Sequence, residues 1–178
     1  MSDNVYLGNP NLKKANTAIE FTQEQILEFM KCKEDPVYFA NNYVKIISLD
    51  EGLTQFHPYH FQEKLINNFH ENRFNICKMP RQTGKSTTVV SYLLHYAVFN
   101  DSVNIGILAN KAATARELLG RLQTAYENLP KWMQQGIIAW NKGSLELENG
   151  SKILAASTSA SAVRGMSFNI LFLDEFAF

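Results

Sequence analysis

The chain has 178 residues, in which 17 Lys and Arg balance 17 Asp and Glu, and 46% of the residues are hydrophobic while 19% are charged. This composition is typical of a globular protein and excludes a disordered chain, which would carry fewer apolar and more charged residues. The length fits one domain with at most a small appendage. Zero net charge argues against a strongly basic nucleic-acid-binding arm, although it leaves room for a local basic patch.

Several missing features predict the compartment. Residues 1–10 are polar and lack the basic-then-apolar layout of a signal peptide. The longest nearly apolar stretch, residues 92–99, is far shorter than the roughly 20 residues that a spanning helix needs. Cys32 and Cys77 form no CxxC pair, and we interpret them as free buried thiols. These features predict a cytosolic protein without a membrane role.

The N-terminal part divides into two regions. Residues 1–20 show no periodicity and are expected to form a loose segment, whereas residues 21–72 are expected to form a small helical region. Three helix starts are signalled there: Thr22 with Gln25 in a capping box, Asp35 followed by Pro36, and Pro58, after which Phe61, Leu65 and Phe69 recur on one face.

From residue 73 to 178 the pattern changes to an α/β core. Short apolar strands alternate with helix-length segments, which indicates a mainly parallel sheet covered on both faces. Asn149-Gly150 is a hairpin-turn signal. The expected strands are 76–79, 103–109, 144–148, 152–156 and 170–173, and the expected helices are 85–99 and a second one that carries Ala115 to Leu129 and ends at Pro130.

A phosphate-binding loop is indicated by residues 79–86 (MPRQTGKS), which match G-x-x-x-x-G-K-[ST] except at Met79. Gly84 lets the backbone turn its amides toward phosphate oxygens, and the following helix offers a positive N-terminus. Lys85 is expected to neutralise the β- and γ-phosphates of a nucleotide, and Ser86 to hold Mg²⁺. The alternative is a surface turn with a lysine, which the position between a strand and a helix disfavours.

Two carboxylates follow the last predicted strand. Asp174 and Glu175 stand at its C-terminal end, where open α/β sheets bind ligands. Asp174 is expected to bind Mg²⁺ through water, and Glu175 to orient or deprotonate the attacking water. Without the loop, such a pair would be interpreted as a solvated strand end.

Other polar residues give weaker signals. Arg81 could reach the γ-phosphate and stabilise transition-state charge, or it could form a salt bridge at the rim of the loop. Gln62 could read adenine through its amide, or it could be an ordinary exposed helix glutamine. His57 and His60 have a ligand-like spacing but no accompanying carboxylate or thiol motif, and we interpret them as surface histidines.

From about residue 20 to its end the sequence closely resembles the ATPase half of the large terminase subunit of tailed bacteriophages, particularly those with contractile tails that infect enteric bacteria. The family shares the departure at the first glycine of the loop. The segments that carry the resemblance are residues 79–88, 103–121, 129–155 (including WNKGSLELENGSKI) and 159–178.

The resemblance implies roles for individual residues. Gln62 falls on the adenine-binding glutamine, Arg81 on the loop arginine proposed to act in catalysis, and Arg164-Gly165 on a family motif of loosely assigned role. The implied catalytic residues are Glu175, Arg81 and Lys85; the ATP-binding residues are Gln62, Arg81, Gln82, Thr83, Gly84, Lys85, Ser86 and Thr87; the Mg²⁺ ligands are Ser86 and Asp174.

The resemblance also implies a motor that hydrolyses ATP to push double-stranded DNA into a procapsid. Its implied partners are the portal protein and the small terminase subunit, and its implied assembly is a homo-oligomeric ring. The implied location is the host cytoplasm, transiently at the procapsid portal. The nuclease activity of the family resides in a separate C-terminal domain and is not expected in this chain.

The end of the chain raises a further expectation. Phe178 comes three residues after Glu175. In the class of P-loop NTPases with an additional strand and a catalytic glutamate, which the family resembles, the next strand lies between the Asp174 strand and the loop strand. We therefore expect an incomplete sheet that is prone to aggregation or needs a second polypeptide.

Two alternatives to the packaging motor remain open. A helicase-type translocase also pairs an adenine-reading glutamine with a phosphate loop and a D-E pair, but Phe176-Ala177-Phe178 replaces the Ala-Asp or histidine expected after that pair. The second alternative is a non-catalytic nucleotide-binding fragment. Glu175→Gln would distinguish the motor from this fragment.

Overall fold

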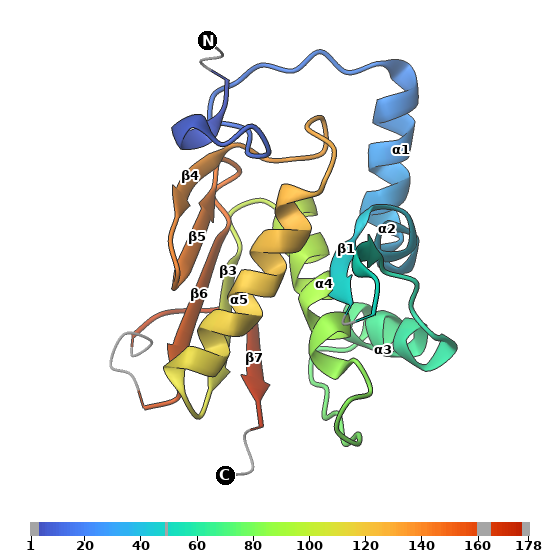
Figure 1. Cartoon of the computed structure of the whole chain (residues 1–178), viewed down its shortest axis with the longest axis vertical. Coiled ribbons are helices and arrows are strands. Elements are labelled where there is room, and N and C mark those ends of the chain that lie inside the picture. The colour runs from blue at the N-terminus through green and yellow to red at the C-terminus, as the bar shows by residue number, and fades with distance from the viewer. Residues whose placement is uncertain (1–3, 49, 160–164, 176–178) are drawn as a thin grey trace.

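The computed structural model describes residues 4–48, 50–159 and 165–175, and it shows a mixed α/β architecture (Figure 1). In chain order the elements are η1 (Tyr6–Gly8), α1 (Gln23–Glu34), α2 (Pro36–Tyr43), β1 (Lys45–Ser48), β2 (Gly52–Gln55), α3 (His60–Glu71), α4 (Lys85–Phe99), β3 (Asn104–Ala109), α5 (Ala112–Glu127), β4 (Ile137–Trp140), β5 (Ser144–Leu147), β6 (Lys152–Ser157) and β7 (Ile170–Asp174).

One five-stranded sheet carries the core, in the order β4-β5-β6-β3-β7. The strand β3 pairs in parallel with both β6 and β7, whereas β5 pairs antiparallel with β4 and β6. The predicted hairpin turn at Asn149-Gly150 joins β5 to β6, and Gly150 has a φ of 81°. The α/β class is therefore confirmed, with a mixed sheet that is parallel around β3.

The helix α5 covers one face of this sheet, and α4 packs against α5. The helix α5 crosses in front of β3 and β6 (Figure 1) and buries the apolar stripe that its periodicity predicts, Ala115, Leu118, Leu119, Leu122 and Tyr126. The helix α4 has the predicted bounds and packs against α2, α3 and α5. Contacts on several sides explain why nearly all of its residues from Thr88 to Phe99 are buried.

The first two predicted helix starts are confirmed in atomic detail. Thr22 Oγ1 accepts a hydrogen bond from the Gln25 N–H at 3.2 Å, and Gln25 Oε1 accepts one from the Thr22 N–H at 3.1 Å. Asp35 Oδ1 accepts from the N–H groups of the second and third residues of α2 at 2.9 and 2.8 Å. These contacts are encoded within four residues of sequence, so they can be recognised locally.

The third helix starts after Pro58 as expected, and its predicted apolar face is confirmed in part. Leu65 and Phe69 are half-buried, and Phe69 packs against the core. Phe61 is 44% exposed, and the buried residues of α3 are Gln62 and Ile66. The polar side chain of Gln62 is turned inward because it has hydrogen-bond partners there, as described below.

The prediction of a loose segment over residues 1–20 is also wrong where the structure describes it. Leu12 is buried, and the chain lies beside β4, where the Ile137 N–H donates to the Lys13 carbonyl at 2.9 Å. Lys13 Nζ forms an ion pair with Glu148 at 2.9 Å. These partners lie more than a hundred residues away in sequence, so no local period reveals them.

The predicted strand at residues 76–79 is absent from the structure. This segment belongs to no strand, and Ile76 is 99% exposed. A strand needs a neighbour for its backbone hydrogen bonds, and the segment has none within the described ranges. Cys77 is exposed in the same segment, which corrects the expectation of a buried thiol there, whereas Cys32 is free and buried as expected.

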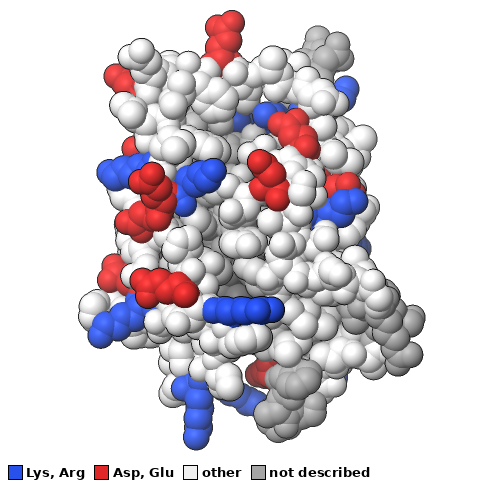
Figure 2. Space-filling view, turned by 180° about the vertical axis from the view of Figure 1, so that it is seen from behind, with Lys and Arg blue, Asp and Glu red and all other residues white. Residues whose placement is uncertain are grey.

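Surface charge is mixed in sign. On the face shown in Figure 2, basic and acidic side chains are interspersed among uncharged ones, which agrees with the balanced composition. In the described ranges, no helix has both the length and the apolar character that crossing a membrane requires.

Candidate functional site

A tight loop leads into α4 at one end of the molecule. Gly84 is the N-cap of α4 and has a φ of 73°, in the left-handed region. The left-handed backbone favours glycine, and a Cβ atom at this position would lie 2.5 Å from Gln62 Nε2 and would displace that amide. The Thr88 N–H donates to the Gly84 carbonyl at 2.9 Å, and the amides of Lys85, Ser86 and Thr87 have no backbone carbonyl partner among the described residues.

The loop wraps around the ammonium group of Lys85. Lys85 Nζ donates to the carbonyls of Met79 and Pro80 at 3.2 and 2.9 Å. Thr83 Oγ1 donates to the same Pro80 carbonyl at 3.0 Å. Ser86 and Thr87 lie half-buried in the first turn of α4. The arrangement presents a cation and free amides at a helix N-terminus, which is the environment that binds anions.

The side chain of Gln62 connects this loop to the N-terminus of α3 through two hydrogen bonds. Its Oε1 accepts a hydrogen bond from the Tyr59 N–H at 2.8 Å, and its Nε2 donates to the Thr83 carbonyl at 3.3 Å. The side chain is only 4% exposed, so it is not the exposed helix glutamine of the alternative interpretation. Each amide atom retains capacity for one more hydrogen bond.

The two predicted carboxylates lie at the C-terminal end of β7. Asp174 is half-buried and pairs in register with Ala109 at the end of β3, and Glu175 is exposed. Burial raises the pKa of Asp174, the neighbouring charge of Glu175 raises it further, and the positive charges of Lys85 and Arg121 oppose the rise. The structure therefore brings Asp174 into the electrostatic neighbourhood of Lys85.

Two non-glycine residues of the predicted site have left-handed backbones. Gln82 has a φ of 61° and Glu175 a φ of 47°. Such conformations cost about 1–3 kcal/mol each and gather at functional sites, where surrounding contacts hold them. The loop and the end of β7 each contain one such residue, and Leu7, Asn16 and Ser102 have positive φ elsewhere in the described chain.

Several other residues that the sequence singles out lie at exposed positions. Arg81 is exposed and makes no ion pair with the described residues. His57 and His60 are exposed, in line with the interpretation as surface histidines, and His60 Nδ1 lies 3.4 Å from Glu63 Oε2. Arg164 and Phe176-Ala177-Phe178 lie outside the described residues.

Arg121 is the residue near this site that motif reasoning missed. It comes from the middle of α5, and its Nη2 donates to Glu117 Oε1 at 2.6 Å. The Glu-x-x-x-Arg spacing is visible in the sequence, but it occurs on many solvated helices. Its proximity to Asp174 depends on how α5 packs, which the spacing does not encode.

Comparison with known proteins gives a consistent result. Residues 76–178, more than half of the chain, match the family model for the N-terminal part of the large terminase subunit, T4likevirus-type. The fold is similar to the crystal structure of the bacteriophage HK97 large terminase, with a TM-score of 0.64 and 18% sequence identity. That match covers 79% of this chain and 30% of the HK97 chain, so the similarity extends over less than a third of that protein. The chain therefore belongs to the family of T4likevirus-type large terminase subunits, whose N-terminal part it matches.

Proposed function

We propose that this chain hydrolyses ATP with Mg²⁺ as the motor part of a viral DNA-packaging enzyme. The observation that carries the proposal is the convergence of two features at one end of the fold. The glycine-turned loop presents Lys85 at the N-terminus of α4, and Asp174-Glu175 end β7 within the electrostatic influence of that lysine. Phosphoryl transfer to water requires this combination of a cationic cradle and carboxylates.

The residues present fit Mg²⁺–ATP. Among the described residues, Lys85 Nζ is held by loop carbonyls alone, which phosphate oxygens can replace. The amides at the start of α4 are available to the same anion. Ser86 and Asp174 offer the oxygen ligands that Mg²⁺ prefers. The bound metal would supply charge neutralisation at the phosphate oxygens.

The remaining residues have roles that follow from their chemistry. Glu175 would orient the attacking water and accept its proton, and its exposed position at the end of β7 leaves room for a water molecule. Arg81, exposed on the loop, would stabilise charge that develops on the transferred phosphoryl group. Gln82, Thr83 and Thr87 would complete the phosphate cradle, and Gln62 would support it and contact adenine.

We infer that the core is a P-loop NTPase of the additional-strand type, formed by residues 73–178 after a helical region at 21–72. An incomplete sheet is part of this inference. Within the described ranges β7 pairs only with β3, Leu171 on β7 is 48% exposed, and Ile76 beside the loop is 99% exposed. One more strand between β7 and residues 76–79 would cover these side chains. Slow hydrogen exchange at the β7 amides that do not pair with β3, measured in the isolated chain, would contradict the inference.

Membership of the terminase family supports the assignment of a substrate and partners. We propose that the energy of hydrolysis moves double-stranded DNA into a procapsid, with the portal protein and the small terminase subunit as partners and a ring of copies as the working form. The work would take place in the host cytoplasm, transiently at the portal. The mixed surface charge in Figure 2 is compatible with a motor that must release DNA as well as hold it.

Equilibrium binding of a fluorescent ATP analogue tests the nucleotide site. Lys85→Ala removes the ammonium group from the loop, and we expect affinity to fall by about ten-fold or more, as for the loss of a charge-assisted hydrogen bond. Lys64→Ala is the matched control, because it removes the same charge from an exposed position on α3. Unaltered affinity in Lys85→Ala would refute the assignment of the loop.

A further inference from the structure

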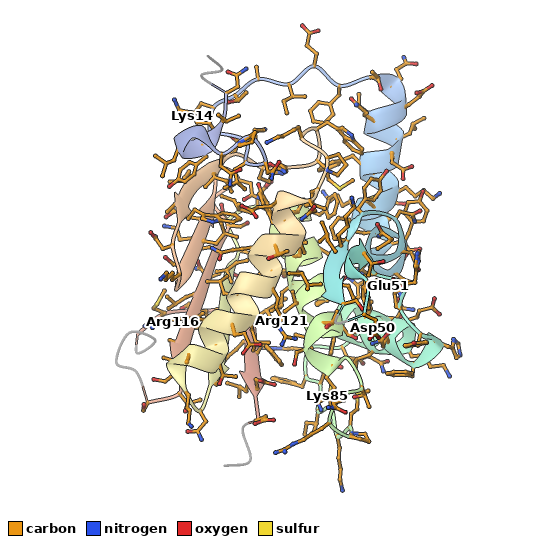
Figure 3. The ribbon with its side chains drawn as sticks, in the orientation of Figure 1. Lys14, Asp50, Glu51, Lys85, Arg116 and Arg121 are labelled. Atoms are coloured by element: carbon orange, nitrogen blue, oxygen red, sulfur yellow. The ribbon has the colours of Figure 1, made fainter. Side chains whose placement is uncertain are left out.

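The helix α5 presents two arginines on opposite sides of its buried stripe. Arg116 and Arg121 are five residues apart, which places them about 140° apart around an α-helix. Arg116 lines an open groove of 380 Å³ together with Ser144 of β5 and Leu154 of β6. Because β3 and β7 follow β6 in the sheet, the other flank of α5 lies toward the β7 edge of the sheet. The helix α5 also packs against α4. In Figure 3 Arg116 lies on the β6 side of α5 and Arg121 on the α4 side, above Lys85.

The electrostatics agree with this placement. The charges of Arg121 and Lys85 both lower the pKa of Asp174 against the larger effect of burial. Arg121 nevertheless makes no ion pair with Asp174 in the described structure; its ion-pair partner is Glu117. Arg121 is therefore close enough to Asp174 to influence its charge, but it is not bound to that carboxylate.

The pair between Arg121 and Glu117 is easily exchanged. Both side chains are more than half exposed, at 51% and 63%, and they are separated by one helical turn. Exposed pairs of this kind contribute little to stability. A guanidinium group keeps its charge at all physiological pH values and binds phosphate oxygens in a bidentate manner. Arg121 can therefore leave Glu117 for a phosphate at small cost.

We propose that Arg121 binds the terminal phosphate of ATP, exchanging Glu117 for a phosphate oxygen, and thereby makes the site prefer ATP to ADP. The inference rests on the proposed function, because it requires that nucleotide binds at Lys85. It adds a cation from α5 to those of the loop. Through this contact, α5 would be bound to the terminal phosphate when ATP, but not ADP, occupies the site.

The ratio of ADP to ATP dissociation constants is the decisive measurement. We would titrate the 178-residue chain with ADP and with a non-hydrolysable ATP analogue, both with Mg²⁺, by calorimetry. Arg121→Ala should lower the preference for the triphosphate by about ten-fold, and Arg121→Lys should restore part of it. Arg116→Ala, on the other flank of the same helix, should keep the wild-type ratio. Glu117→Gln, which removes the competing carboxylate, should keep or raise the ratio of ADP to ATP dissociation constants.

The outcomes separate this inference from the proposed function. If Lys85→Ala weakens both nucleotides while Arg121→Ala leaves the ratio unchanged, Arg121 is only a surface residue and the inference is overturned. If Lys85→Ala has no effect on either nucleotide, the proposed function itself fails. A purely structural role of Arg121 would weaken both nucleotides equally, and this result would also overturn the inference.

Discussion

At the scale of single residues, Gln62 shows how one side chain can serve both the fold and the site. Its oxygen accepts from the backbone of Tyr59, and its nitrogen donates to the Thr83 carbonyl in the loop. Glycine at position 84 leaves the space that the Gln62 amide occupies. The loop geometry thus depends on a residue that comes more than twenty positions earlier in the sequence.

Gln62→Glu separates support of the loop from recognition of adenine. The carboxylate keeps the bond from the Tyr59 N–H but faces the Thr83 carbonyl with a second oxygen, so we expect nucleotide affinity to fall by about three- to ten-fold. If Gln62 also reads the base, the preference for ATP over GTP falls as well. Competition binding with both nucleotides measures this preference. Unchanged affinity for both would show that Gln62 has neither role.

At the scale of elements, the contact between α1 and α4 contains a buried histidine. His95 of α4 is 2% exposed, and its Nε2 lies 2.9 Å from the Cys32 carbonyl near the end of α1. Its Nδ1 has no hydrogen-bond partner in the described structure. Burial lowers the pKa of His95 from 6.5 to about 4, with a smaller contribution from the charge of His70, while the hydrogen bond to Cys32 and the charge of Asp35 act against the shift.

This histidine should make the stability of the protein sensitive to acid. Below pH 6.5 the unfolded chain takes up the proton, whereas folded His95 stays neutral down to about pH 4. The free energy of unfolding should therefore fall as the pH is lowered through this window, by about 3 kcal/mol in total. Urea unfolding midpoints at pH 7 and pH 5 measure the effect. His95→Gln should flatten the pH dependence of the free energy of unfolding, whereas His60→Gln, at an exposed position, should leave it intact. Equal pH dependence in the wild-type protein and both variants would contradict the account.

At the scale of the whole molecule, local signals could be predicted from the sequence and long-range partners could not. The caps at Thr22 and Asp35, the buried helix α4 and the turn at Gly150 depend on neighbouring residues, and the structure confirms them. The contacts of Leu12 beside β4 depend on residues far along the chain, and prediction failed there.

The candidate site follows the same division. The loop and the Asp174-Glu175 pair are recognisable because each is a short pattern, and their assigned roles stay predictions. The tether of Gln62 to the loop and the position of Arg121 arise only when α3 and α5 pack against the rest of the molecule. Apolar spacing places Phe61 rather than Gln62 inside, and this error arises because two hydrogen bonds outweigh a simple apolar period.

ATP turnover by Glu175→Gln tests the central claim most directly. The change removes the carboxylate charge at the end of β7 but keeps its size, so the account predicts nearly unchanged ATP binding and a loss of turnover of about 10²- to 10⁴-fold. Glu146→Gln, whose carboxylate pairs with Lys152 on the neighbouring strand, is the control and should keep wild-type turnover. Turnover by Glu175→Gln equal to that of the wild-type protein would contradict the account.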